Sequence, residues 1–146
     1  MIVSSVLLGL KKTKIRSTSS RKNPRSVFLY DSDDLKTLTS LVNQGIIQTT
    51  SLEVLYFLGR YSKDQESTPD HLDPFLEARD AQPEELRPMR EMICAFGQGQ
   101  IPCLLRAASE GMDLRIGFES GIWLPDGTIA PDNADLVHTL AGLLPD

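Results

Sequence analysis

Glu119 and Arg115 are the two side chains whose types and spacing most clearly suggest chemistry. Glu119 follows the stretch DLRIGF, so it ends an apolar run and does not lie on a charged helix. If that run is a strand, its side chains alternate, and Arg115, Gly117 and Glu119 face the same side. A carboxylate in that position can ligate a metal or act as a base, and an inward-facing arginine needs an anionic partner. A structural Arg–Glu pair would explain the same spacing, and both interpretations stay open.

A second candidate is the glycine-punctuated loop Gly97-Gln98-Gly99-Gln100, which precedes an expected helix. Backbone N–H groups at such a loop can bind phosphates or carboxylates, and we therefore predict that these four residues bind substrate. The spacing is neither that of a dinucleotide fingerprint nor that of a P-loop. A tight turn between a strand and a helix remains the alternative.

Histidine and cysteine patterns point to structural roles. His71 and His138 are not spaced with another His or Cys as a metal pair would be. Cys94 and Cys103 lie in apolar segments without a CxxC pattern, so we expect buried, reduced thiols. No Ser-His-Asp or Cys-His arrangement is indicated by a motif.

Apolar runs that alternate with amphipathic stretches set the expected architecture. Candidate strands cover 26–30, 52–58, 91–96 and 113–118, and candidate helices cover 31–45, 67–76, 101–110 and 132–144. Four β-α units predict a parallel α/β sheet, equivalent to half of a TIM (β/α)8 barrel. A complete barrel usually takes about 250 residues, so 146 residues are too few to close one alone.

The strand ends give the expected location of the site. In a barrel of this kind, chemistry collects at the carboxyl ends of the strands. Four places in the sequence follow a strand directly: 30–34, 59–61, 97–100 and 119–120. We expect these segments to meet at one edge of the sheet.

Charge is distributed unevenly along the chain. Residues 1–30 hold seven basic and no acidic side chains, so 31–146 hold eight basic against all 20 acidic residues, a balance of −12. Such an acidic body should repel nucleic acid, and no apolar run is long enough to span a membrane. We predict a basic, poorly ordered segment over 1–25 and a single domain over 26–146. The basic, serine-rich start is compatible with a mitochondrial presequence, and a surface segment on a cytoplasmic protein is the simpler interpretation.

Three stretches resemble the beta-keto acid cleavage enzyme family. DLRIGFESGIWLPDGTIAPDNADLV resembles the family's last strand, loop and helix, and AFGQGQIP resembles the glycine-rich loop before it. YFLGRY, followed by STPDHLDPFL, resembles the preceding strand, loop and helix. The resemblance is good over 52–144, weaker over 26–45 and absent from 1–25. The family includes the 3-keto-5-aminohexanoate cleavage enzyme of lysine fermentation.

The resemblance implies a zinc-dependent TIM barrel that exchanges acyl groups between a beta-keto acid and acetyl-CoA, giving acetoacetate and a new acyl-CoA. It implies that Glu119 is the carboxylate zinc ligand and that Arg115 positions and activates substrate groups. Gln100 matches a glutamine in the family's preceding loop.

The chain also departs from the family pattern. Ser120 occupies the catalytic position where the family has an acid, Gln98 replaces the family's loop arginine, and no His-x-His zinc-ligand pair is present. One hypothesis is therefore a truncated or divergent enzyme of this family. The other is a non-catalytic half-barrel that associates with itself or with another half-barrel, and a homo-oligomer is expected in either case.

Overall fold

The computed structural model describes residues 6–8, 25–59 and 62–145. Within these residues, five strands form one sheet in the order β1-β5-β4-β3-β2. The strands are β1 (Val6–Leu8), β2 (Arg25–Leu29), β3 (Leu52–Phe57), β4 (Arg90–Cys94) and β5 (Asp113–Ile116). The α-helices are α1 (Ser32–Asn43), α2 (Asp73–Asp80), α3 (Gln100–Ser109) and α4 (Asn133–Leu143).

The pairing of the strands confirms the predicted fold class. Strands β2, β3, β4 and β5 are parallel neighbours, and each is followed by one of the α-helices. This is the alternating parallel α/β arrangement that also builds one half of a (β/α)8 barrel. The carboxyl ends of these four strands consequently lie at one edge of the sheet, as the site prediction requires.

Strand β1 was not among the predicted strands. It pairs antiparallel with the edge of β5, with Leu7 opposite Arg115. Most of the predicted basic segment 1–25 lies outside the described residues, and β2 already begins at Arg25. The short antiparallel strand leaves the parallel order of the other four unchanged.

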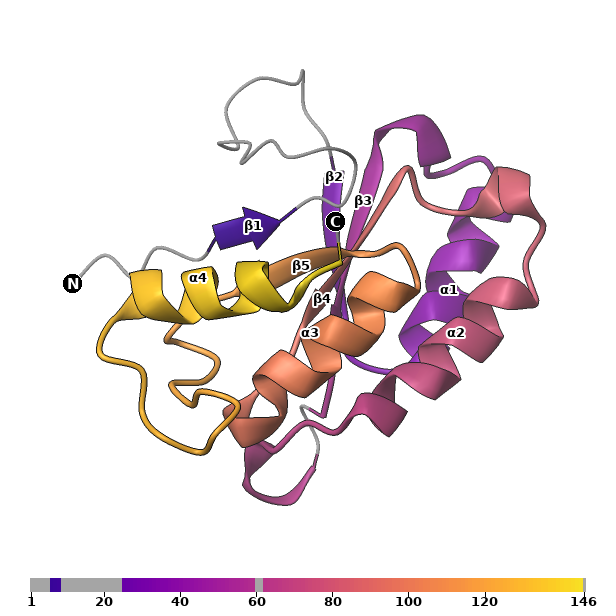
Figure 1. Ribbon diagram of the computed structural model, residues 1–146. Helices are drawn as coiled ribbons and strands as arrows, with labels where there is room; N and C mark the ends of the chain where they lie inside the picture. The colour runs from indigo at the N-terminus through magenta and orange to yellow at the C-terminus, as the bar shows by residue number, and fades with distance from the viewer. Residues whose placement is uncertain (1–5, 9–24, 60–61, 146) are drawn as a thin grey trace.

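The two faces of the sheet have different environments. The α-helices lie on one side of the sheet (Figure 1), and alternate strand residues on that side are fully buried in the main core. Val54, Ile93 and Leu114 are 0% exposed there. On the opposite face, Leu55, Met92 and Cys94 form a smaller buried cluster with Phe57 and Phe96 packed against it. We call this second side the helix-free face.

Charged side chains are paired at the amino-terminal end of the sheet. On the helix-free face Arg90 lies between Glu53, at 3.9 Å, and Asp113. On the helix-covered side the hydroxyl of the buried Tyr56 donates to Glu91 at 2.7 Å, and burial raises the pKa of Tyr56 well above its ordinary value. The charged groups at this end of the sheet therefore have partners, and they lie away from the carboxyl ends of the strands.

None of the helices in the described part of the chain combines the length and the apolarity needed to cross a membrane.

Candidate active site at the carboxyl ends of the strands

The Arg115–Glu119 pair stands at the end of β5. A guanidinium nitrogen of Arg115 lies 3.3 Å from Oε1 of Glu119, and about 30% of each side chain is exposed. The Glu119 carboxylate folds back over Gly117, where it occupies the space that a Cβ atom would fill. Arg115 and Glu119 do meet, but β5 ends at Ile116, so a turn and not strand alternation brings them together. The pair is partly open to solvent.

The turn that carries Glu119 is organised around the carbonyl of Gly117. This oxygen accepts hydrogen bonds from the backbone N–H groups of Ser120, at 3.0 Å, and Gly121, at 3.3 Å. The side-chain amide of Gln100 donates to the same oxygen at 3.1 Å. One carbonyl therefore links the end of β5 to the first residue of α3.

The Gly97–Gly99 segment forms a single 3-10 turn between β4 and α3. Its Gly97 has a φ of +69°, which favours glycine, and the N–H of this residue donates to the carbonyl of Ser120 at 2.8 Å. The N–H of Gln98 donates to Oε2 of Glu66 at 3.0 Å. The loop thus does bind a carboxylate through a backbone N–H, but the carboxylate is the chain's own. Substrate binding by Gly97, Gln98, Gly99 and Gln100 stays a prediction.

Ser67 joins the loop after β3 to the end of β4. Its buried hydroxyl donates to the carbonyl of Leu58 and accepts from the N–H of Phe96, each at 2.7 Å. Its own N–H donates to the carbonyl of Phe96 at 3.1 Å, and its carbonyl leaves no room for a side chain on Gly99. No local pattern indicates these contacts, because Ser67 stands at the start of a predicted helix and its partners are distant in the sequence.

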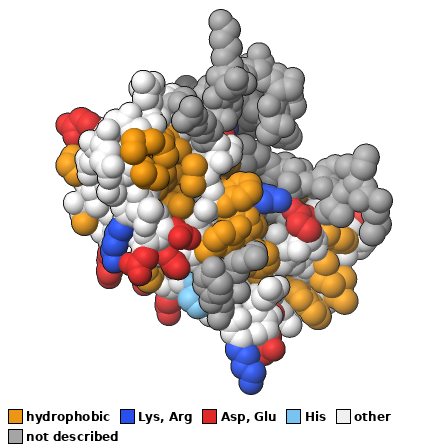
Figure 2. All heavy atoms as spheres, turned by 180° about the vertical axis from the view of Figure 1, so that it is seen from behind, with side chains coloured by type: hydrophobic (Ala, Val, Ile, Leu, Met, Phe, Trp, Pro, Cys, Tyr) orange, Lys and Arg blue, Asp and Glu red, His pale blue; other side chains and the backbone are white. Residues whose placement is uncertain are grey.

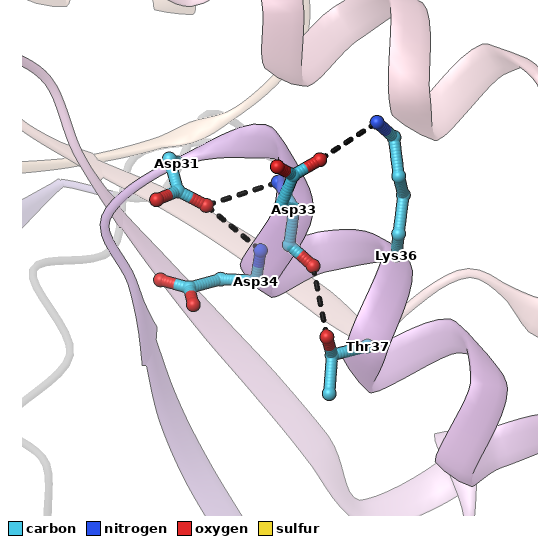
Figure 3. Close-up of polar contacts among 5 residues, drawn as sticks. All are labelled: Asp31, Asp33, Asp34, Lys36 and Thr37. Atoms are coloured by element: carbon cyan, nitrogen blue, oxygen red, sulfur yellow. Dashed lines mark hydrogen bonds and ion pairs between the residues drawn. The ribbon is translucent and has the colours of Figure 1, made fainter.

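The acidic cluster after β2 serves the start of α1, not the site. Oδ1 of Asp31 accepts from the N–H groups of Asp33 and Asp34, at 3.0 and 2.9 Å, while Asp33 pairs with Lys36 at 2.8 Å (Figure 3). Asp34 in turn accepts the N–H of Tyr30 at 2.8 Å. These hydrogen bonds make Asp31 the N-cap of α1.

Ser120 and Cys94 meet beneath the turn. Their side-chain oxygen and sulfur atoms are 3.4 Å apart, and the residues are 9% and 1% exposed. Burial raises the pKa of the Cys94 thiol, an effect that the Ser120 hydroxyl and the charge of Arg115 partly offset. Cys94 and Cys103 are both buried and free, as predicted.

The described residues do not make a zinc site by themselves. Within them, no group of three or more His, Cys, Asp or Glu side chains is arranged to hold a metal ion. A catalytic zinc usually takes three protein ligands, and Glu119 would provide one. Nδ1 of His71 is used by the N–H of Thr68 at 3.1 Å, in agreement with the structural role expected for that histidine.

The fold and the groups at its strand ends together indicate a class of protein. The parallel β-α units place a charged pair, a glycine-rich turn and a buried amide at the carboxyl ends of the strands, which is where (β/α)8-barrel enzymes carry their active sites. The family model for beta-keto acid cleavage enzyme matches residues 13–146 of this chain. The chain therefore belongs to the beta-keto acid cleavage enzyme family.

Proposed function

We propose that this chain carries the β5 part of an active site for beta-keto acid cleavage, in which an acyl group is exchanged with acetyl-CoA to give acetoacetate and an acyl-CoA. The observation that carries the proposal is the partly open Arg115–Glu119 pair at the end of β5, in a chain of this family. The substrate class and acetyl-CoA come from the family. A cytoplasmic location is proposed with it, and the mitochondrion is the alternative because the first 30 residues are basic.

Arg115 is proposed to bind the negative charge of the substrate. A guanidinium has five N–H donors, and the contact with Oε1 of Glu119 leaves others for a carboxylate or an enolate oxygen. Fixed donors of this kind are most effective where charge develops during the reaction. Glu119 keeps the guanidinium in place and is the proposed carboxylate ligand of the family's zinc. The described residues supply this one zinc ligand and no group of three. The chemistry proposed for this chain therefore depends on the Arg115–Glu119 pair itself.

Ser120 and the Gly97–Gln100 loop complete the proposed site. A serine hydroxyl does not ionise near neutral pH, so Ser120 can donate a hydrogen bond but cannot replace a carboxylate base. Gln98 carries no charge, so anion binding at this loop would depend on backbone N–H groups. That of Gln98 is available only when the Glu66 carboxylate moves away.

The test is acetoacetate release by the purified full chain, supplied with zinc, acetyl-CoA and a panel of beta-keto acids. Glu119→Gln and Arg115→Met should each lower the rate at least about 100-fold, the usual scale for loss of a charge-stabilising group. Glu110→Gln is the matched control. Arg106 and Glu110 have the same four-residue spacing and the same 3.3 Å distance, with comparable exposure. No acetoacetate from the wild-type chain, or an equal loss in the control, would count against the proposal.

A second candidate function is a half-barrel that associates with a second copy. Phe28 on the edge strand β2 is 52% exposed, and it contacts Phe57, which in turn stacks on Phe96. Seen from behind, hydrophobic side chains gather on the surface (Figure 2). An exposed aromatic side chain on an edge strand favours association, and a face that also carries Glu53, Arg90 and Asp113 offers both signs of charge to an identical partner.

Light scattering during size-exclusion chromatography tests this candidate. The wild-type chain should run as a dimer and Phe28→Ser as a monomer. Ile46→Ser should remain dimeric, because Ile46 is at least as exposed as Phe28, at 59%, but follows α1. A monomeric wild-type chain at high concentration would exclude the association.

A further inference from the structure

We propose that Gln100 is a positioning residue: its side-chain amide holds the carbonyl of Gly117 and thereby fixes the Glu119 carboxylate against Arg115. The functional meaning of this contact rests on the proposed function, but the contact itself and its test do not.

The first observation is the environment of Gln100. The residue begins α3 and is 1% exposed, which is unusual for a glutamine. Its Nε2 donates to the Gly117 carbonyl at 3.1 Å. Among the described residues its Oε1 has no hydrogen-bond partner. Exchanging the two amide atoms would set two oxygens against each other, so the hydrogen bond fixes the orientation of the amide.

Packing alone does not account for a glutamine here. A buried acceptor without a partner is destabilising, and an apolar side chain of the same length would fill the space without that cost. What such a side chain could not do is donate to Gly117. The amide N–H is therefore the part of the side chain that the site uses.

The second observation is where the contact falls. The Gly117 carbonyl also accepts the N–H groups of Ser120 and Gly121, which close the turn around Phe118 and Glu119. At the other end of this turn, a Cβ on Gly121 would lie 3.2 Å from Nε2 of Gln100. Gln100 thus bonds to one end of the turn and lies beside the other, and Glu119 lies between them.

Other contacts hold different parts of the same turn. Gly97 and Cys94 hold Ser120, and Asn133 of α4 accepts the N–H of Phe118 at 3.2 Å. Within the described residues, Gln100 supplies a side-chain donor to the carbonyl of Gly117, the same residue whose missing Cβ leaves the space that the Glu119 carboxylate fills. Loss of this donor should leave the Gly117 carbonyl with only the two backbone donors of its own turn and so loosen the pair, while the rest of the turn stays attached.

The experiment compares Gln100→Met and Gln100→Leu with the wild-type full chain by NMR. In both variants the amide protons of Ser120 and Gly121 should exchange about fivefold faster, equivalent to about 1 kcal/mol for one lost hydrogen bond. The guanidinium signals of Arg115 and the carboxyl carbon of Glu119 should shift. The corresponding signals of Arg106 and Glu110, the matched pair at the carboxyl end of α3, should not shift. Gln44→Met, the same change at the exposed end of α1, should alter neither pair.

A purely structural glutamine would behave differently. General loosening would change the Arg106 and Arg115 signals alike, and either that result or an unchanged Arg115 signal in a folded variant overturns the proposal. Unfolding of both variants also overturns it, since the apolar side chains are expected to fill the site. None of these readouts requires zinc, acetyl-CoA or turnover, so a failed activity assay would leave the positioning role intact.

Discussion

Gly117→Ala should disable the Arg115–Glu119 pair while leaving the fold intact. A Cβ at this position would collide with the Glu119 carboxylate, which is the free end of a flexible side chain. Gly117 does not have a positive φ, so an alanine backbone fits. We expect the carboxylate to swing off the glycine and move away from Arg115.

The two energetic effects of this substitution nearly cancel. A partly exposed ion pair at 3.3 Å contributes about 0.2–1 kcal/mol, which is lost. Replacing glycine by alanine restricts the unfolded chain and contributes about 0.4–1 kcal/mol of stability, which is gained. The net change should lie within about 1 kcal/mol, which moves the Tm of a chain of this size by no more than about 4 °C.

Gly99→Ala is the matched comparison, because it has a φ of −76° and adds the same methyl group. There the methyl meets the backbone carbonyl of Ser67, which cannot move without disturbing the hydrogen bonds to Phe96. Overpacking against a fixed backbone should cost about 3 kcal/mol or more.

Thermal unfolding, the Arg115 guanidinium signals and acetoacetate release are measured for both variants. If Gly117→Ala unfolds as readily as Gly99→Ala, or if it keeps the wild-type Arg115 signals, the Glu119 carboxylate does not depend on the space over Gly117.

Two further predictions concern α1 and the buried thiols. Asp31→Ala should destabilise the chain by about 1 kcal/mol, because two N–H groups lose their acceptor. Asp33→Ala removes only the exposed pair with Lys36 and should cost clearly less. Urea unfolding measures both costs, and equal costs would contradict the capping role of Asp31. Burial raises the pKa of Cys103 from 9.0 to about 12, so the unfolded thiol ionises while the folded one stays protonated, and stability should fall as the pH rises from about 9 to 12. Cys103→Ala should lose less stability than wild type over that window in urea titrations, and parallel curves would refute the assignment.

The architecture was predictable because local patterns agree with one another. Alternating apolar runs and helical stripes predicted the four parallel strands and four helices, and Asp31 and Gly45 marked the ends of α1. The boundaries shifted by a few residues where backbone hydrogen bonding decides them. β4 was expected over 91–96 and runs from Arg90 to Cys94.

Contacts between distant loops were not predictable from those patterns. Strand β1 is three residues long and is fixed by pairing with β5. Glu66 and Ser67 act on Gln98 and Phe96, about 30 positions away, so no local spacing reveals them. The sequence did not indicate the burial of Gln100 for the same reason, because its partner Gly117 lies in the turn that follows the next strand.

The central pair was predicted correctly, but by an incomplete argument. Alternation along a strand places Arg115 and Glu119 on one side, yet four residues of extended chain span about 13 Å, too far for direct contact of the two side chains without folding back. The strand in fact ends at Ile116, and the turn around the Gly117 carbonyl brings the carboxylate to 3.3 Å from the guanidinium. The geometry of the pair therefore depends on the turn and on what holds it. Residues outside β5 consequently control the chemistry available at Glu119, and substitutions that leave Arg115 and Glu119 in place can still abolish it.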